Sequence, residues 1–151
     1  MIQGVIVKEL KVWPDDRGFL MEVFKQDEFE DIPVKQTTYT VAYPGTIKAF
    51  HWHKKQWDVW FFTSGSAQVV LSDLRKDSPT FGKTEVFYPG EHKRLLIAIP
   101  PHVAHGYRVL GTIPAALLYH TSEMYDVKNP DEERIPWNDK NIGFDWNTIF
   151  K

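Results

Sequence analysis

Short apolar runs with polar punctuation dominate the chain. Segments rich in aromatic and β-branched residues alternate with clusters of Gly, Pro, Asp and Ser, which is typical of β-strands joined by turns. The segments that predict strands are 17–24, 36–43, 46–53, 57–62, 67–74, 83–88, 94–99, 105–110 and 115–121. A helix is expected only around residues 26–30. The pattern therefore predicts an all-β protein.

Turn signals between these runs predict how the strands connect. Two apolar runs flank Ser64 and Gly65, which predicts a hairpin, and the sequences AYPG at 42–45 and YPG at 88–90 predict further turns. Strands that follow one another this closely suit a sandwich or a barrel, and a closed barrel or a double-sheet jelly roll leaves few exposed edges. Because no repeat or linker interrupts the chain, residues 1–151 are expected to form a single domain.

The last part of the chain, residues 126–151, is rich in Asn, Pro, Asp and Trp. It carries three well-separated aromatic residues, Trp137, Phe144 and Trp146. Disordered tails are poor in such residues because they bury little apolar surface. We therefore expect an ordered extension that wraps the barrel.

The composition narrows the classes of function. The chain has no cysteine, which excludes disulfides, thiolate chemistry and sulfur-bound zinc. A net charge of -2, with scattered Lys and Arg, gives no electrostatic footprint for nucleic acid or for an anionic membrane. No apolar run approaches the roughly 20 residues of a membrane span, and the N-terminal residues do not read as a signal peptide. A cytoplasmic protein with small-molecule or protein partners is expected.

Histidines and one aspartate occur at a regular spacing in the middle of the chain. His51 and His53 are two residues apart on a predicted strand, so both point to one face, which in a small barrel can be the interior. This region resembles the first motif of the cupin superfamily, with aspartate in place of the usual glutamate. The matching residues are Gly45, His51, His53, Asp58 and Gly65. The second motif is resembled in part by Pro100, His102 and His105, with histidine in place of glycine.

Two interpretations of this cluster stay open. In metal-binding cupins the matching residues are ligands, which makes His51, His53, Asp58 and His105 a candidate site for a divalent metal, Zn, Fe, Mn or Ni. In the alternative, they are interior histidines that are hydrogen-bonded to tyrosines and backbone, with Asp58 in a salt bridge or solvated. We assign the remaining histidines, His92 and His120, to structural or surface roles.

Longer segments resemble one enzyme family over most of the chain. They are DDRGF at 15–19, GTIKAFH at 45–51, SDLRKDSPTFG at 72–82, IPPHVAHGY at 99–107, LLYHTSEMYD at 117–126 and WNDKNIGFDW at 137–146. In these segments the chain resembles the dTDP-4-dehydrorhamnose 3,5-epimerases. The resemblance implies a cupin jelly-roll barrel and an isomerase that acts on a nucleotide-linked 4-keto-6-deoxy sugar in deoxysugar or surface polysaccharide biosynthesis. It also implies that no cofactor is required, and that homodimers form through exchanged N-terminal strands.

The chemistry of that family explains the residues it needs. A 4-keto group acidifies the hydrogens at C3 and C5, so epimerisation needs a base on one face of the ring, an acid on the other and a group that stabilises the enolate. The resemblance implies that His51 is the base and Tyr119 the acid, with His105 in the same pocket. The substrate-binding residues that it implies are Arg17 and Lys48 at the diphosphate, together with Phe19, Glu22, Gln36 and Tyr125.

Several positions depart from the family pattern. Lys48 stands where the family has arginine, and Asp58 stands where it has the lysine credited with stabilising the enolate. The family's base is oriented by an aspartate from a C-terminal region that has no counterpart before residue 151, so His51 is expected to use another partner. His53 is a further departure and moves the site toward the metal-binding set.

These departures keep two rival hypotheses open. One is a metal-dependent keto-sugar isomerase, in which the ion polarises the keto oxygen. A metal-bound His51 could not remove a proton, so Tyr119 or a metal-bound hydroxide would then be the base. The other is a non-catalytic subunit that binds a sugar nucleotide.

Overall fold

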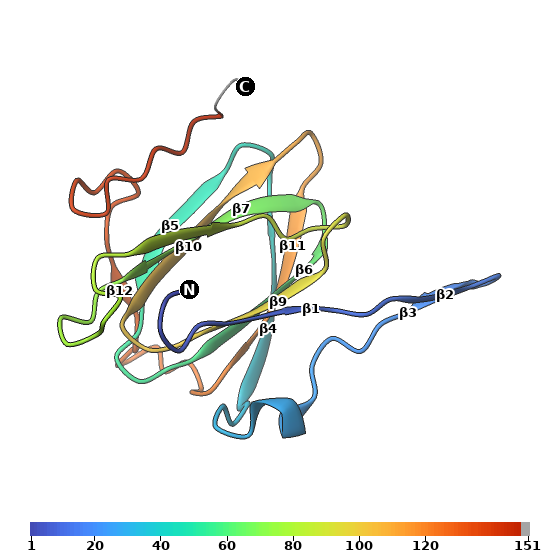
Figure 1. Ribbon diagram of the computed structural model, residues 1–151, viewed down its shortest axis with the longest axis horizontal. Coiled ribbons are helices and arrows are strands. Elements are labelled where there is room, and N and C mark those ends of the chain that lie inside the picture. Colours follow the sequence, from blue (N-terminus) through green and yellow to red (C-terminus); the bar gives the residue numbers. More distant parts are fainter. Residues whose placement is uncertain (149–151) are drawn as a thin grey trace.

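Two five-stranded antiparallel sheets face each other in the computed structural model, which describes residues 1–148 (Figure 1). The strands are β1 (Ile6–Glu9), β2 (Trp13–Asp15), β3 (Gly18–Leu20), β4 (Gln36–Ala42), β5 (Ile47–Trp52), β6 (Asp58–Ser64), β7 (Ser66–Asp73), β8 (Thr84–Phe87), β9 (Leu95–Ile99), β10 (Val103–Leu110), β11 (Ala115–Thr121) and β12 (Glu133–Arg134). One sheet has the order β1-β9-β6-β11-β4, and the other has the order β12-β5-β10-β7-β8. This confirms the predicted all-β jelly-roll architecture.

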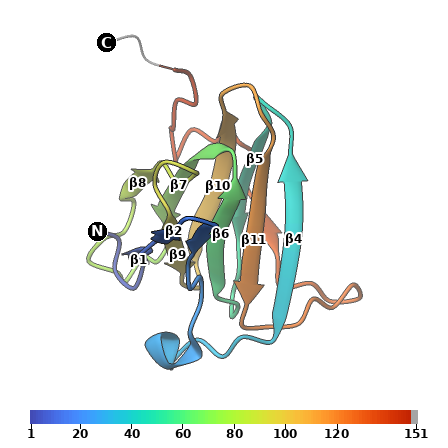
Figure 2. The ribbon, with the colours of Figure 1, turned by 90° about the vertical axis from the view of Figure 1, so that its right-hand side faces the viewer.

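Strand β4 shows how alternation in the sequence positions polar side chains inside the barrel. Successive side chains of a strand point to opposite faces. Gln36, Thr38 and Thr40 are partly buried and point inward, whereas Thr37 and Tyr39 are exposed. Because β4 lies at the edge of its sheet (Figure 2), this inward row lines an accessible part of the barrel interior.

The apolar core fills the rest of the space between the sheets. It is formed by buried side chains of both sheets, including Phe62, Val69, Leu71, Ile97, Val103 and Leu117. A second cluster covers the outer face of β6 and β9 and includes Leu10, Phe29, Ile32, Val59 and Phe61. Since both faces of β9 are covered, the strand is buried along its whole length, which explains its unbroken apolar sequence.

The hairpin predicted at Ser64 and Gly65 is wrong in its pairing. Gly65 joins β6 to β7, but β6 pairs with β9 and β11 in one sheet, whereas β7 pairs with β8 and β10 in the other. Gly65 has a φ of 70°, and a Cβ atom there would lie 2.6 Å from the carbonyl oxygen of Pro114. Only glycine fits this close crossing between sheets. The flanking apolar runs are therefore two core strands of different sheets.

The N-terminal region differs from the predicted strands. The segment 17–24 forms a strand only at β3, which pairs with β2, and this β2–β3 hairpin extends away from the barrel (Figure 1). Met21, Val23 and Phe24 pack against the second cluster instead, so their apolar character reflects packing and not a strand. The predicted helix at 26–30 is a short 3-10 helix, η1 (Gln26–Phe29), and β1 was not predicted.

The C-terminal segment packs on the barrel as expected. Strand β12 extends the edge of β5, and Trp146 is buried against Phe50 with a distance of 5.4 Å between the ring centroids. The indole Nε1 of Trp146 donates a hydrogen bond to the carbonyl oxygen of Trp137 at 2.9 Å. The prediction for 126–151 is thus confirmed as far as residue 148, and 149–151 lie outside the described residues. Within residues 1–148, none of the helical segments is long and apolar enough to cross a membrane.

Candidate active site

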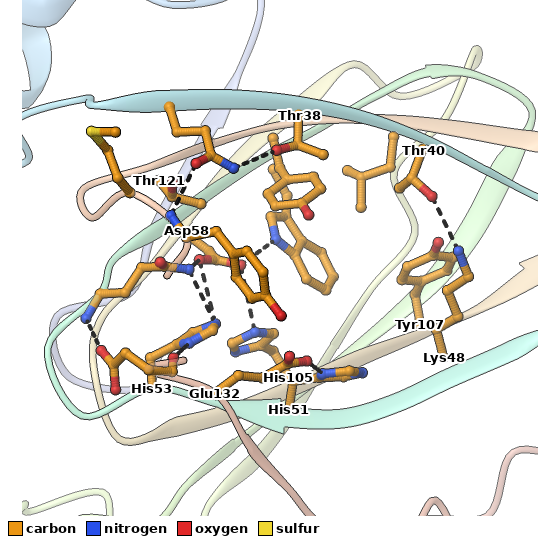
Figure 3. Close-up of a pocket in the computed structure, with 18 residues that line it drawn as sticks. Thr38, Thr40, Lys48, His51, His53, Asp58, His105, Tyr107, Thr121 and Glu132 are labelled. Atoms are coloured by element: carbon orange, nitrogen blue, oxygen red, sulfur yellow. Dashed lines mark hydrogen bonds and ion pairs between the residues drawn. The ribbon is translucent and has the colours of Figure 1, made fainter. Parts of the chain in front are cut away.

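A cavity of about 480 Å³ opens between the two sheets (Figure 3). Its walls combine polar side chains with aromatic rings. The lining residues are Gln36, Thr38, Thr40, Lys48, His51, His53, Gln56, Asp58, Trp60, His105, Tyr107, Leu117, Tyr119, Thr121, Met124, Tyr125, Asp131 and Glu132. A mostly apolar cleft with a few convergent titratable groups is the usual form of a small-molecule site.

His51 lies on β5 and forms a histidine–carboxylate pair with Glu132. The Nδ1 atom of His51 contacts the Oε1 atom of Glu132, and both side chains are partly buried. Because an ionised carboxylate can only accept, Nδ1 carries the hydrogen and Nε2 is left with a free lone pair. Burial raises the pKa of Glu132, but the hydrogen bond with His51 and the charge of Arg134 lower it more, so Glu132 is ionised.

Tyr119 reaches the same cavity from the other sheet. It lies on β11, opposite Thr38 of β4 and Trp60 of β6, whereas His51 lies on β5 of the facing sheet. The side chain is half-buried, and burial raises the pKa of its phenol against the opposing effect of a hydrogen bond with Thr38. The phenol is therefore protonated at neutral pH. A lone-pair base and a protonated acid thus line one cavity from opposite walls.

A second group of histidines surrounds Asp58 deeper in the barrel. The Nε2 atoms of His53 and His105 each lie 3.6 Å from a different oxygen of the Asp58 carboxylate. The Nε1 atom of Trp60 and the Nε2 atom of Gln56 donate to the same carboxylate at 3.0 and 2.8 Å. All three titratable side chains are buried. Asp58 is thus held by four neighbours from both sheets.

Burial and hydrogen bonding set the charges in this group. Burial raises the pKa of Asp58, but the interaction with His53 and the hydrogen bond from the Gln56 amide lower it more, to about 2. Burial lowers the pKa of His53, but Asp58 raises it more, so that the net shift is upward. Burial lowers the pKa of His105 to about 4. At neutral pH Asp58 is therefore ionised and His105 neutral, and the charge of Asp58 favours the protonated form of His53.

The same three residues fit the donor set of a divalent metal. Candidate ligand atoms of His53, Asp58 and His105 lie within 4.8 Å of one another. The other ring nitrogen of each histidine faces a backbone carbonyl, that of Asp131 for His53 and that of Val103, at 2.9 Å, for His105. Such carbonyls orient metal-binding histidines and leave Nε2 to the ion. Two imidazoles and a carboxylate suit zinc and similar ions.

His51 is not part of this three-residue group. The predicted four-residue metal set is therefore divided by the structure, with His51 beside Glu132 and the other three residues around Asp58. The sequence interpretation treated a metal ligand and a base as exclusive roles for His51. The structure places His51 outside the three-residue group, so a metal there would not occupy His51.

The remaining predicted residues divide between the cavity and the β2–β3 region. Gln36, Lys48 and Tyr125 line the cavity, and the side-chain oxygen of Gln36 accepts a hydrogen bond from the backbone N–H of Tyr125 at 3.0 Å. Arg17 and Phe19 lie on the exposed hairpin, and Glu22 follows it. Arg17 pairs with Asp15 there, and none of these three residues lines the cavity of its own chain.

The other histidines occupy structural positions. His102 has a φ of 60°, the left-handed region that glycine adopts readily, which explains why the related motif has glycine there. His120 points away from the cavity, packs on Phe24 and interacts with the hydroxyl of Thr37 at 2.9 Å. His92 is exposed in a turn.

Sequence reasoning missed several lining residues of the cavity, among them Glu132, Gln56 and Tyr107. Glu132 lies in the irregular segment before β12, Gln56 lies in the loop before β6, and Tyr107 was not singled out within β10. The only signal for Glu132 is a run of acidic residues, which by itself indicates a solvated loop. The antiparallel pairing of β12 with β5 brings this run against His51.

Comparison with known proteins gives the family. A family model described as dTDP-4-dehydrorhamnose 3,5-epimerase matches residues 1–151. The spore coat polysaccharide biosynthesis protein SpsL of Bacillus subtilis is 53% identical over 151 residues, which are 100% of both chains. The probable low-salt glycan biosynthesis epimerase Agl13 of Haloferax volcanii is 40% identical over 148 residues, which are 97% of this chain and 95% of that protein.

Solved structures agree with this assignment. The crystal structure of dTDP-4-dehydrorhamnose 3,5-epimerase from Bacillus anthracis, with TDP and PPi bound, has a TM-score of 0.86 and 26% sequence identity. The match covers 97% of this chain and 87% of that chain. The chain therefore belongs to the dTDP-4-dehydrorhamnose 3,5-epimerase family and is a sugar-nucleotide epimerase, an enzyme of the isomerase class.

Proposed function

We propose that this enzyme inverts C3, C5 or both in a dTDP-linked 4-keto-6-deoxy sugar, with His51 as base, Glu132 as its orienting carboxylate and Tyr119 as acid. The observation that carries the proposal is the His51–Glu132 pair in one cavity with Tyr119. Glu132 supplies the carboxylate that the non-catalytic hypothesis took to be missing. The similarity to SpsL and Agl13 supports a role in deoxysugar or surface polysaccharide biosynthesis.

The geometry supports a two-step proton transfer. The Nε2 atom of His51 removes the proton from the carbon next to the keto group, and the electron pair moves onto the keto oxygen as an enolate. Glu132 stabilises the imidazolium that forms. The phenol of Tyr119 then protonates the same carbon from the opposite face, which inverts it. Both side chains finally exchange protons with water, so solvent hydrogen enters the product.

Solvent-deuterium uptake tests this mechanism. We expect the wild-type protein to incorporate deuterium at C3 or C5 of a dTDP-4-keto-6-deoxy sugar in D₂O, as measured by NMR. His51→Ala and Tyr119→Phe should each slow the uptake by about 10²-fold or more, while binding of dTDP stays close to that of the wild type. Uptake at the wild-type rate in both variants would exclude this pair as base and acid.

The exposed β2–β3 hairpin supports a homodimer in which one protomer completes the site of its partner. Arg17 and Phe19 lie on this hairpin and outside the cavity of their own chain. An arginine suits a diphosphate because its guanidinium can bind two oxygens at once. Light scattering should therefore give the mass of a dimer, and Arg17→Ala should weaken dTDP binding. A monomer with unchanged dTDP affinity in this variant would contradict the arrangement.

A cytoplasmic location stays a prediction.

The second candidate is a metal-assisted isomerase, which the convergence of His53, Asp58 and His105 supports. A divalent ion held by these three residues would supply an electrophile for the keto oxygen. His51 would stay free as base, since it lies outside the group. The metal content of protein purified without chelator tests this candidate. Near one ion per wild-type chain, lost in His53→Ala and Asp58→Ala, would support it, and ion-free wild-type protein would refute it.

A further inference from the structure

The hydroxyl of Tyr107 is a buried polar group that the described chain leaves without a partner. Tyr107 lines the cavity from β10 and is 3% exposed, yet its hydroxyl has no hydrogen-bond partner among residues 1–148. Leaving such a group unpaired is unfavourable, and nearly all buried polar groups have a partner. A molecule that enters the cavity can supply this partner.

The ring of Tyr107 is fixed, so the hydroxyl cannot turn to find another partner. It packs edge-on against Trp60 and Phe62, with centroid distances of 5.7 and 5.2 Å and interplanar angles of 90° and 81°. An ordinary tyrosine phenol is protonated at neutral pH, so the hydroxyl is available as a hydrogen-bond donor.

Lys48 lies beside Tyr107 at the same end of the cavity (Figure 3). The two residues are opposite each other in the pairing of β5 with β10. Gly106 allows the two strands to approach, because a Cβ atom there would lie 2.4 Å from the Cβ atom of Ala49. The ammonium of Lys48 donates to the hydroxyl of Thr40 at 3.1 Å and keeps further hydrogens for a ligand.

The cavity is polarised between its two ends. Lys48 is the only lysine or arginine among the described lining residues, whereas Asp58 and Glu132 gather with the histidines at the other end (Figure 3). The third acidic lining residue, Asp131, contacts His53 through its backbone carbonyl. An anionic oxygen is therefore attracted to the end with Lys48 and Tyr107 and repelled by the other. A nucleotide-linked keto sugar offers two such oxygens, one on the diphosphate and one on the enolate formed during the reaction.

We propose that the Tyr107 hydroxyl and the Lys48 ammonium bind one anionic oxygen of the substrate together, so that Tyr107 is a substrate-binding residue of this enzyme. The inference rests on the proposed function, because the substrate class defines which oxygens are present. If the oxygen belongs to the enolate, the pair takes over the role of the lysine that Asp58 replaces. If it belongs to the diphosphate, the pair anchors the nucleotide.

The test is Tyr107→Phe, which keeps the ring and removes only the hydroxyl. Exposed Tyr39, on the outer face of β4, gives the matched control Tyr39→Phe. Two quantities are measured, the affinity for dTDP by calorimetry and the rate of deuterium uptake at saturating substrate. Because a hydrogen bond to a charged oxygen is lost, one of the two should fall by about tenfold or more.

Each outcome has one meaning. Weaker dTDP binding with unchanged uptake assigns the oxygen to the diphosphate, and slower uptake with unchanged dTDP binding assigns it to the enolate. Both quantities at wild-type values would overturn the inference, as would a lower melting temperature of the free protein with neither quantity changed. A wild-type protein that takes up no deuterium would instead refute the proposed function, and the calorimetric arm would still test a diphosphate contact.

Discussion

The cavity contains two histidine–carboxylate groups built from the same residue types in different surroundings. His51 and Glu132 form a partly exposed pair, with one carboxylate for one imidazole. Asp58 is buried, and His53 and His105 share its carboxylate with two further donors. The first group leaves a free imidazole nitrogen at the cavity, whereas the second engages every polar atom of its carboxylate. The two groups contain the same residue types. They differ in burial and in the number of partners, and this difference distinguishes a candidate base from a structural or metal-binding group.

The largest expected effect comes from breaking the exposed pair. Glu132→Gln keeps the shape of the side chain but removes the charge that orients His51 and stabilises its protonated form. We expect the rate of deuterium uptake to fall by about 10²-fold, with a melting temperature near that of the wild type because the pair is partly solvated. Glu133→Gln is the control, since Glu133 pairs with Lys54 and does not line the cavity. Equal rates in the two variants would show that Glu132 does not serve the base.

Breaking the buried group should lower the free energy of unfolding more than breaking the partly exposed pair does. Asp58→Asn removes the charge that faces His53 and His105, and loss of one partner of a buried ion pair lowers the free energy of unfolding by about 3 kcal/mol or more. Urea unfolding of Asp58→Asn and Glu132→Gln measures the difference. A smaller loss in Asp58→Asn than in Glu132→Gln would reverse our ranking of the two groups.

A third carboxylate, that of Asp73, serves as a reference for the two groups because it lies outside the cavity. Asp73 accepts hydrogen bonds from Arg75, Ser78 and Thr80. Burial raises the pKa of Asp73, but these hydrogen bonds lower it by a larger amount. The resulting pKa lies well below the usual value of 3.8. We expect Asp73→Asn to lower the free energy of unfolding by about 2 kcal/mol at neutral pH, and to leave deuterium uptake unchanged.

The sign of the pH dependence follows from this lowered pKa. The contribution of Asp73 is present above the pKa of the unfolded chain and is lost as the pH falls through the lower pKa of the folded chain. The stability difference between the wild type and Asp73→Asn should therefore shrink below about pH 4. Unfolding of both proteins between pH 7 and pH 3 checks this. A difference that does not change over this range would show that Asp73 stabilises the fold by another route.

The sequence predicted the barrel better than it predicted the site. Alternating and apolar runs identify the strands because each strand must bury a face, but the partner of a strand depends on contacts that are distant in sequence, as β6 and β7 show. His51 and Tyr119 were found because they lie in segments with family motifs. Glu132 was missed because it lies in an irregular segment whose position depends on the pairing of β12 with β5. Arg17 and Phe19 could not be placed from one chain, because the proposed role of the hairpin needs a second copy.

Deuterium uptake by metal-free protein tests the central claim, that His51 and Glu132 and not the Asp58 group perform the chemistry. The protein is treated with a chelator, shown to be free of metal by mass spectrometry, and assayed in D₂O. Our account predicts that metal-free wild-type protein takes up deuterium at C3 or C5 at the rate of untreated protein, and that metal-free His51→Ala does not. Uptake that disappears with the metal and returns with added zinc or manganese would contradict the account, because an ion held by His53, Asp58 and His105 would then be needed for the reaction.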